Sequence, residues 1–286
     1  MRHAVFTIVQ DEPFFYSIWY KHYRQHFDYQ NIYTLYHSLP GEDGDTEPWW
    51  LRVPAQAGVN LVHIFREKSF DHTWLREQVE RFAGFLLGSY DTVTFAEVDE
   101  IITVDPDKSK DLRLADWFDN WCGRGGYPAV RCNGYEVVHR FDDEPGLDPM
   151  VILDYGGSRV LKDRNWWYSS VLYSKTLTWR VQPRWDNGFH SCYIDMGGGQ
   201  YEPLRIPREP SLLLVHLHKV DYQIAAKRWR RTSSRVWNEA DKQGWSGLQN
   251  RFRDESQLRD WWYRSVDNAG RAANLVQIPA TIRSII

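Results

Sequence analysis

Cysteine is scarce in this chain, and long apolar runs are missing altogether. Only three cysteines occur among 286 residues, Cys122, Cys132 and Cys192, with no pair at the spacing of metal ligands. Their small and odd number excludes a disulfide scaffold or a cysteine zinc framework and is typical of reduced thiols in a cytosolic protein. No stretch approaches the roughly 18 consecutive apolar residues of a membrane span.

A surplus of positive charge is also missing. Lys and Arg number 35 against 38 Asp and Glu, so the net charge is −3. The chain therefore lacks the basic balance that favours binding to phosphate backbones, and we expect no nucleic acid among its partners. The apolar run from Ala4 to Val9 is too short, and too soon followed by Asp11 and Glu12, for a signal peptide. We therefore expect a cytoplasmic protein.

Aromatic side chains, in contrast, are abundant, with 15 tryptophans and 16 tyrosines. The hydrophobic content of 42% is enough for a substantial core and excludes collagen-like and disordered chains. Neighbouring pairs such as Trp49-Trp50, Trp166-Trp167 and Trp261-Trp262 cannot all point inward. Aromatic faces beside a polar cleft suit the apolar faces of sugars or a nucleobase. For any single tryptophan, core packing is the competing interpretation.

Apolar periodicity predicts alternating strands and helices in the first third of the chain. The expected strands cover residues 4–9, 31–36, 59–65 and 92–96, and the expected helices cover 13–27 and 71–87. Pro13 suits the first turn of one helix, and Asp71 is the expected N-cap of the other. This order predicts an α/β fold with a mostly parallel central sheet flanked by helices.

Beyond Pro106 the pattern is more mixed, and no linker divides the chain. We expect helices at 110–122, 222–237 and 259–266, and strands at 129–132, 135–141 and 212–218. Asn133-Gly134 is a typical two-residue hairpin turn between two of these strands. Residues 39–50 and 155–173 are expected to be irregular, and the end of the chain is expected to be a loose tail.

Three carboxylates at the end of the strand predicted at 92–96 are the strongest functional signal. Glu97, Asp99 and Glu100 lie where open α/β sheets bind their ligands. Glu97 and Asp99 are two apart, so on an extended backbone their side chains leave the same face. Neighbouring carboxylates raise each other's pKa unless a cation lies between them, and a divalent ion with oxygen ligands would resolve that conflict. A solvated acidic turn is the alternative.

Two further features bear on such a site. His216 and His218 alternate along a predicted strand and so share a face, either as polar residues on a half-exposed edge or as metal ligands. The helix predicted at 222–237 is basic, with Lys227, Arg228, Arg230, Arg231 and Arg235. It is either a solvated face or a contact for an anionic acceptor or for the inner membrane surface, where attachment would be peripheral.

Four motifs, in order over residues 3 to 240, resemble those of bacterial family-2-like glycosyltransferases. In that family an apolar strand ends in Asn-Glu before an aromatic helix, and an Asp-x-Asp-Glu signature follows. Ser-Lys with Trp-x-x-Gly-Phe-His comes next, and a late strand ends in His. The corresponding segments here are Val9-Gln10-Asp11-Glu12 with Trp19 and Tyr23, Glu97-Val98-Asp99-Glu100, Ser174-Lys175 with Trp185-Asp186-Asn187-Gly188-Phe189-His190, and Val215-His216-Leu217-His218.

The resemblance implies a GT-A-type, Rossmann-like fold with a smaller mixed region on the acceptor side. It implies a nucleotide-sugar-binding half at 1–106, an acceptor-side and catalytic half of the same domain at 107–240, and a C-terminal helical extension at 241–286. It further implies transfer of a sugar from a UDP- or GDP-linked donor to a hydroxyl of a saccharide or lipid-linked acceptor, such as a surface polysaccharide precursor. Mn²⁺ or Mg²⁺ would assist by neutralising the leaving phosphates.

The resemblance also assigns metal ligands by position. Asp99 would be the metal-binding acid of the signature. Glu97 would take the place of its first Asp, contacting ribose or metal with a side chain one methylene longer than the family's Asp. His216 or His218 would supply a ligand from the late strand.

Roles at the substrate follow from the same resemblance. A cationic side chain such as Lys175 or Arg184 would help the metal to neutralise the phosphates. Asp186 and His190 lie in the segment that the resemblance places near the cleft, and they are the candidate bases for the acceptor hydroxyl. The residues implied for substrate binding are Glu12, Glu97, Glu100, Lys175 and Trp185.

Two other classes of protein stay open. Tyr36-His37-Ser38 stands where the family has an Asp and a Ser/Thr-Asp-Gly turn, which suggests a catalytically degenerate carbohydrate- or nucleotide-binding protein unless Glu42 or Asp43 makes the nucleotide contact. A nucleotidyltransferase or phosphatase could also use the acids. It would need a lysine- or glycine-rich phosphate loop after the first strand, and Gln10-Asp11-Glu12-Pro13 offers none.

Overall fold

The computed structural model of the protein describes residues 1–38, 48–65, 70–110, 113–140, 142–148, 160–234, 236–239, 241, 252–267 and 274–286. Glu42, Asp43 and Arg235, which the sequence analysis singled out, lie outside the described residues. Within the described ranges, no helix is both long enough and apolar enough to cross a bilayer.

Strands and helices alternate in the N-terminal half, and strands predominate afterwards. The strands are β1 (His3–Val9), β2 (Ile32–Ser38), β3 (Asn60–Phe65), β4 (Thr92–Phe95), β5 (Glu100–Val104), β6 (Ala129–Val138), β7 (Trp166–Ser169), β8 (Thr176–Trp179), β9 (Tyr193–Gly197), β10 (Gln200–Pro203), β11 (Arg208–Lys219) and β12 (Leu275–Gln277). The helices are α1 (Pro13–Tyr23), α2 (Trp49–Gln56), α3 (His72–Leu87), α4 (Leu114–Arg124), α6 (Tyr222–Ser233), α8 (Glu255–Asp267) and α10 (Ala280–Arg283), with 3₁₀ turns at Tyr29–Asn31 and Val160–Asp163.

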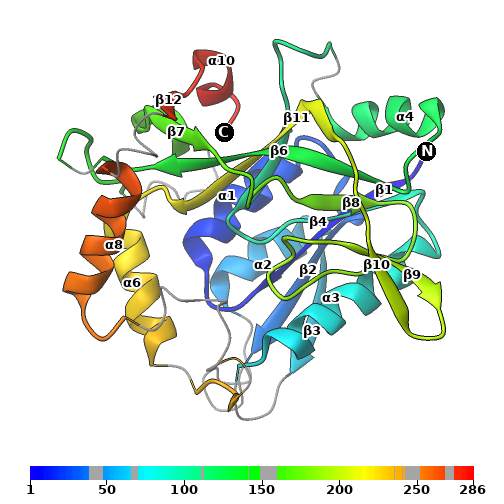
Figure 1. Ribbon diagram of the computed structural model, residues 1–286, viewed down its shortest axis with the longest axis horizontal. Helices are drawn as coiled ribbons and strands as arrows, with labels where there is room; N and C mark the ends of the chain where they lie inside the picture. The colour runs from blue at the N-terminus through cyan, green and yellow to red at the C-terminus, as the bar shows by residue number, and fades with distance from the viewer. Residues whose placement is uncertain are drawn as a thin grey trace.

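One mixed sheet extends through the described part of the chain, in the order β12-β7-β6-β8-β4-β1-β2-β3 (Figure 1). Its strands β4, β1, β2 and β3 are parallel neighbours, with Val5 opposite Ile32 and Thr94. The predicted α/β fold with parallel central strands between helices is therefore confirmed. Beyond β4 the sheet is mixed, because β8 is antiparallel to β4 and β6, whereas β11 is parallel to β6 and antiparallel to β5.

Helices cover both faces of the parallel strands. Successive side chains of a strand point to opposite faces. On β2, Tyr33 contacts Phe82 of α3, with ring centroids 5.7 Å apart. The next residue, Thr34, hydrogen-bonds Tyr16 of α1, and the two hydroxyl oxygens are 2.8 Å apart. Helices α3 and α1 therefore lie on opposite sides of the sheet.

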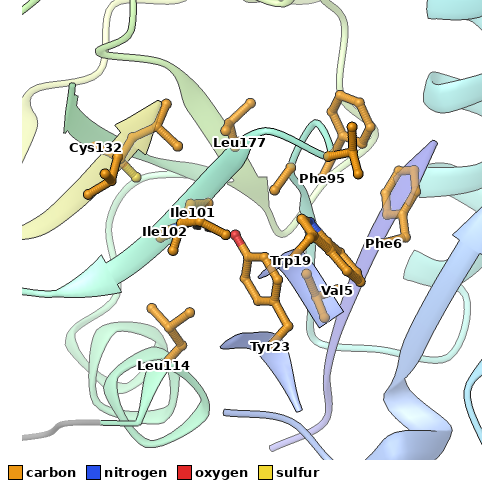
Figure 2. Close-up of a cluster of buried hydrophobic side chains, with 14 of the residues drawn as sticks. Val5, Phe6, Trp19, Tyr23, Phe95, Ile101, Ile102, Leu114, Cys132 and Leu177 are labelled. Atoms are coloured by element: carbon orange, nitrogen blue, oxygen red, sulfur yellow. Dashed lines mark hydrogen bonds between the residues drawn. The ribbon is translucent and has the colours of Figure 1, made fainter. Parts of the chain in front are cut away.

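Side chains of α1 also complete the pairing of β5, whose strand partner in the described residues is β11. On the other edge of β5, the Tyr23 hydroxyl accepts from the Ile102 N–H at 2.9 Å, and His22 Nε2 donates to the Ile102 carbonyl at 2.8 Å. Figure 2 shows Tyr23 within the buried cluster, its hydroxyl directed toward Ile101 and Ile102. Because unpaired buried backbone groups are costly, this contact holds the strand that follows the acidic segment in place.

Several predictions about local structure are confirmed, and others are wrong. Asp71 caps α3 by accepting from the Trp74 N–H at 2.9 Å, as predicted. Asn133-Gly134 is not a turn but lies inside the continuous strand β6. Of the two segments expected to be irregular, part of residues 155–173 forms β7, and the last two residues of 39–50 begin α2 at Trp49. The expected loose tail instead pairs as β12 with β7 and continues into α10, where Ile282 is buried.

Gly134→Ala is expected to lower the free energy of unfolding by about 3 kcal/mol. A Cβ at Gly134 would lie 2.1 Å from the carbonyl carbon of Tyr173 and 2.4 Å from the backbone nitrogen of Ser174, and neither atom can rotate away. Gly123→Ala in α4 is the matched control, because nothing lies within 4 Å of its Cβ. There alanine should stabilise the helix by about 0.5–1 kcal/mol. Urea unfolding distinguishes the two, and equal midpoints would contradict the close approach at Gly134.

Candidate metal and substrate site

The acids predicted at the end of β4 lie in a turn, which separates their side chains. Between β4 and β5, the Glu100 N–H donates to the Glu97 carbonyl at 2.8 Å. The backbone is not extended here, so the expectation that Glu97 and Asp99 share a strand face is wrong. The Leu217 N–H donates to the Asp99 carbonyl at 2.8 Å. This bond holds Asp99 beside the two histidines that flank Leu217 on β11.

Asp99, His216 and His218 form a group that could hold a metal ion. One ligand atom from each lies within 4.8 Å of the others. Asp99 Oδ2 is 3.9 Å from His216 Nε2 and 3.6 Å from His218 Nδ1. The two imidazole rings are nearly parallel, with centroids 5.8 Å apart, so the prediction that they share a strand face is confirmed. One carboxylate from the turn between β4 and β5 and two imidazoles from β11 therefore converge.

Glu136 of β6 orients His216 from behind. Its Oε1 accepts from His216 Nδ1 at 2.9 Å, and the Glu136 side chain is fully buried. Because a carboxylate can only accept, Nδ1 carries the proton and Nε2 of the neutral ring keeps its lone pair toward Asp99. Burial opposes a charged imidazole, but the Glu136 carboxylate raises the pKa of His216 above its usual value. A carboxylate behind the ring is the usual arrangement at metal-binding histidines.

A cationic side chain already contacts the same acid. Arg228 of α6 donates from Nη1 to Asp99 Oδ2 at 2.5 Å and from Nε to Glu12 Oε1 at 2.8 Å. Arg231, one turn later, also binds Glu12. Burial favours the neutral acid, but the Arg228 guanidinium holds the pKa of Asp99 well below its usual range. These two arginines of the basic helix are therefore paired with acids of the site, whereas a membrane contact of the helix stays a prediction.

Glu97 and Glu100 share a lysine. Lys175 Nζ is 2.7 Å from Glu97 Oε2 and 2.6 Å from Glu100 Oε1. Burial disfavours the ammonium, but the two carboxylates raise the pKa of Lys175 above its usual value. The cation that resolves the predicted crowding of these two acids is therefore the lysine of the Ser174-Lys175 motif. Asp99 is the acid of the segment that faces the histidines.

Asp99, the two histidines, Lys175 and Arg228 line a cavity of about 260 Å³ at the carboxyl ends of β1 and β4. Tyr173 stacks on His216, with ring centroids 3.9 Å apart, and closes one side. All four motifs of the resemblance therefore contribute to one cavity. Its charged and histidine lining residues are Glu12, Glu97, Asp99, Lys175, Arg228, His72, His190, His216 and His218, and its aromatic ones are Phe70, Tyr173, Phe189, Trp237 and Trp261.

The segment from Trp185 to His190 is divided between two places. His190 lines this cavity and donates from Nδ1 to the Leu172 carbonyl at 2.8 Å, so Nε2 keeps its lone pair. Partial burial lowers the pKa of His190. Asp186 lines a different cavity, and its carboxylate accepts a backbone N–H of its own turn at 3.0 Å. Trp185 is only 3% exposed and packs against Phe189, as a core tryptophan does.

Glu136 and Arg228 bind members of the Asp-His-His group, although the sequence analysis gave neither of them a role in it. For Glu136 a signal exists, because a lone acid between Tyr135 and Val137 in an apolar strand stays buried only when it is paired. For Arg228 the sequence contains no comparable signal. A basic helix does not reveal by itself which of its faces meets an acid contributed by a distant turn.

Comparison with known proteins gives little support beyond this geometry. Neither a protein-family model nor a curated protein matches the chain. Among solved structures, the apo form of mouse xyloside xylosyltransferase 1 is similar over 49% of this chain and 52% of that chain, with 6% sequence identity and a TM-score of 0.23. The chain thus spans about half the length of that protein. A likeness of this size establishes neither a family nor an activity.

Proposed function

We propose that the protein is a glycosyltransferase that moves a sugar from a nucleotide-diphosphate donor to a hydroxyl of a saccharide or lipid-linked acceptor. Asp99, His216 and His218 would hold the assisting cation. The observation that carries the proposal is this Asp-His-His group, which opens on a cavity at the carboxyl ends of the central parallel strands. That edge is where α/β sheets bind nucleotides.

The donor set supports Mn²⁺ rather than Mg²⁺. Two of the three ligand atoms are imidazole nitrogens, whereas Mg²⁺ prefers oxygen ligands in an octahedron. When bound, the cation would neutralise the charge that develops on the leaving diphosphate. Arg228 would have to release Asp99 Oδ2, and its planar guanidinium would then suit the phosphates. Glu136 would keep the Nδ1 of His216 committed to its own carboxylate, so that Nε2 is the nitrogen that faces the cation.

His190 is the better of the two candidate bases. Its Nε2 keeps a lone pair because Nδ1 is committed to the Leu172 carbonyl. Its lowered pKa keeps the ring neutral, and so able to accept a proton, at pH 7. Asp186 is occupied by the backbone of its own turn. The acceptor hydroxyl would therefore lose its proton to His190.

A specific contact favours a second candidate, a carbohydrate- or nucleotide-binding protein of the same fold that uses no metal. Arg228 Nη1 lies 2.5 Å from Asp99 Oδ2, at the atom that a metal would need. In this alternative Arg228 is a permanent internal cation, and donor phosphates would bind to it directly. The two candidates differ in whether donor binding depends on a divalent ion.

Thermal unfolding with UDP- and GDP-sugars, each with Mn²⁺ or with EDTA, distinguishes them. A donor present at a hundred times its dissociation constant should stabilise the fold by about 2.7 kcal/mol. The glycosyltransferase proposal expects this shift with Mn²⁺ and its loss with EDTA, together with slow donor hydrolysis detected as free nucleotide. The same shift in EDTA, without hydrolysis, would support the metal-free alternative. No shift from any donor would contradict both glycosyl transfer and nucleotide binding.

A further inference from the structure

A second and larger cavity lies on the other side of the segment from Trp185 to His190. It has a volume of about 1220 Å³ and is bordered by α3, by residues 182–187 and by the β9–β10 hairpin. In Figure 1 the hairpin and α3 lie next to one another, away from α6 and α8. Trp185, Asp186 and Asn187 line this cavity, and Gly188, Phe189 and His190 line the first one. A single short segment thus forms a wall of both.

The wall of the second cavity is held in place by a buried acid. Glu80 of α3 is 2% exposed. Its two carboxylate oxygens accept from Arg184 Nη1 at 2.7 Å and from the Trp185 N–H at 2.8 Å. The Glu80 backbone carbonyl also accepts from Gln182 Nε2 at 2.7 Å. Because these bonds tie residues 182–185 to a helix, the cavity is preformed and does not need a ligand to shape it.

The hairpin contributes aromatic faces. Tyr201 of β10 is 48% exposed, and the Arg184 guanidinium lies 5.8 Å from its ring centroid. Tyr193 of β9 lines the same cavity, and its N–H donates to the Arg184 carbonyl at 2.9 Å. A tyrosine ring exposed in this cavity offers an apolar face with a polar rim, which suits the C–H face of a pyranose.

The charges of the lining are balanced and incompletely paired. Three arginines, Arg76, Arg81 and Arg184, face three acids, Glu77, Glu80 and Asp186. The Arg81–Glu77 and Arg76–Glu80 pairs are 3.8 Å apart, longer than hydrogen bonds. Guanidinium groups only donate and carboxylates only accept, whereas a hydroxyl does both. The hydroxyls of a neutral polyhydroxyl ligand can hydrogen-bond both the arginines and the acids of this lining. An anion would be repelled by the acids, and a cation would be repelled by the arginines.

We propose that this second cavity binds a neutral oligosaccharide, the distal part of the acceptor, so that its terminal sugar reaches the first cavity past the wall formed by residues 185–190. The acceptor role rests on the proposed glycosyl transfer, whereas the saccharide site stands on the cavity alone. At about 1220 Å³ the cavity exceeds the roughly 300–1,000 Å³ of ordinary small-molecule sites, as a chain of several sugars would require.

The test screens the 286-residue chain, without donor or metal, against an array of neutral, uronate-containing and sulfated oligosaccharides. Calorimetry then measures the affinity of the best neutral binder. Tyr201→Ala should weaken that affinity at least tenfold. Tyr127→Ala is the matched control, because Tyr127 is 51% exposed but does not line the cavity. Its affinity should equal that of the wild type.

Three results would overturn the saccharide site: no neutral oligosaccharide binds, the charged ones bind better, or Tyr201→Ala binds as well as the wild type. The Mn²⁺-dependent donor shift, measured on the same variants, separates this inference from the proposed function. If the protein binds saccharide through Tyr201 but shows no donor shift, the saccharide site stands and the proposed glycosyl transfer is wrong. If it shows the donor shift but binds no saccharide, glycosyl transfer stands and the saccharide site is wrong. If both are present, Tyr201→Ala should raise the acceptor KM at least tenfold with kcat unchanged.

Discussion

Arg228→Met is expected to lower the free energy of unfolding by about 3 kcal/mol in metal-free buffer, and Mn²⁺ is expected to restore much of that loss. The substitution leaves Asp99 without its hydrogen-bonded cation, and it leaves Glu12 with Arg231 alone. A divalent ion would then enter the Asp-His-His group without a competitor for Asp99 Oδ2. Urea unfolding in EDTA and in MnCl₂ measures both effects.

Arg230→Met is the matched control, because Arg230 lies on the same helix but pairs with Glu255 in an exposed ion pair. Exposed pairs contribute only about 0–1 kcal/mol, so this variant should unfold almost like the wild type with or without Mn²⁺. If Mn²⁺ fails to rescue Arg228→Met, and if donor binding in EDTA is lost in that variant, Arg228 is itself the cation of the site. The metal-free alternative would then hold.

Asp99→Asn is expected to weaken Mn²⁺ binding at least a hundredfold. Loss of a residue that only hydrogen-bonds a metal ligand typically costs about 10–100-fold, and loss of a ligand itself should cost more. Asparagine keeps the size of the side chain and an oxygen for Arg228, so the fold should survive. Calorimetric titration with MnCl₂ gives the two dissociation constants. The donor shift that depends on Mn²⁺ should disappear in the same variant.

Glu97→Gln tests the competing assignment in the same acidic segment. Lys175 holds the Glu97 carboxylate, and that lysine keeps Glu100 when Glu97 is neutralised. Mn²⁺ affinity should therefore stay within about threefold of the wild type, since Glu97 is not one of the three ligands of the Asp-His-His group. A loss as large as that of Asp99→Asn would show that the metal lies between Glu97 and Asp99, as the resemblance in sequence implies.

The parallel half of the sheet could be predicted from the sequence because its signals are local. Strands with continuous apolar runs, Pro13 at a helix start and Asp71 at an N-cap each depend on neighbouring residues, and the structure confirms them. Asn133-Gly134 shows the limit of such signals. A dipeptide typical of turns stays extended in β6, because the glycine is needed there for the close approach of the backbone around Tyr173.

The candidate site could be predicted only in part, since its pairings are set by tertiary contacts. The two histidines share a face because strand geometry alone dictates it. The resemblance in sequence names Asp99 as the metal-binding acid, and the structure brings Asp99 next to the histidines. The pairing of Glu97 and Glu100 with Lys175 was not predictable, because this lysine, just before β8, lies far along the chain. The same holds for Arg228, which reaches Asp99 across the cavity. The domain boundaries at 106 and 240 and the roles of Asp186 and His190 stay predictions.

The pairing of β5 with β11 has a consequence for the order of events during synthesis. In the described residues β5 has β11 as its strand neighbour, and β11 also carries both imidazoles beside Asp99. A growing chain that ends before Arg208 would hold β5 by α1 on one edge and leave the other edge bare. In a nascent chain the proposed metal group is therefore incomplete until β11 has left the ribosome.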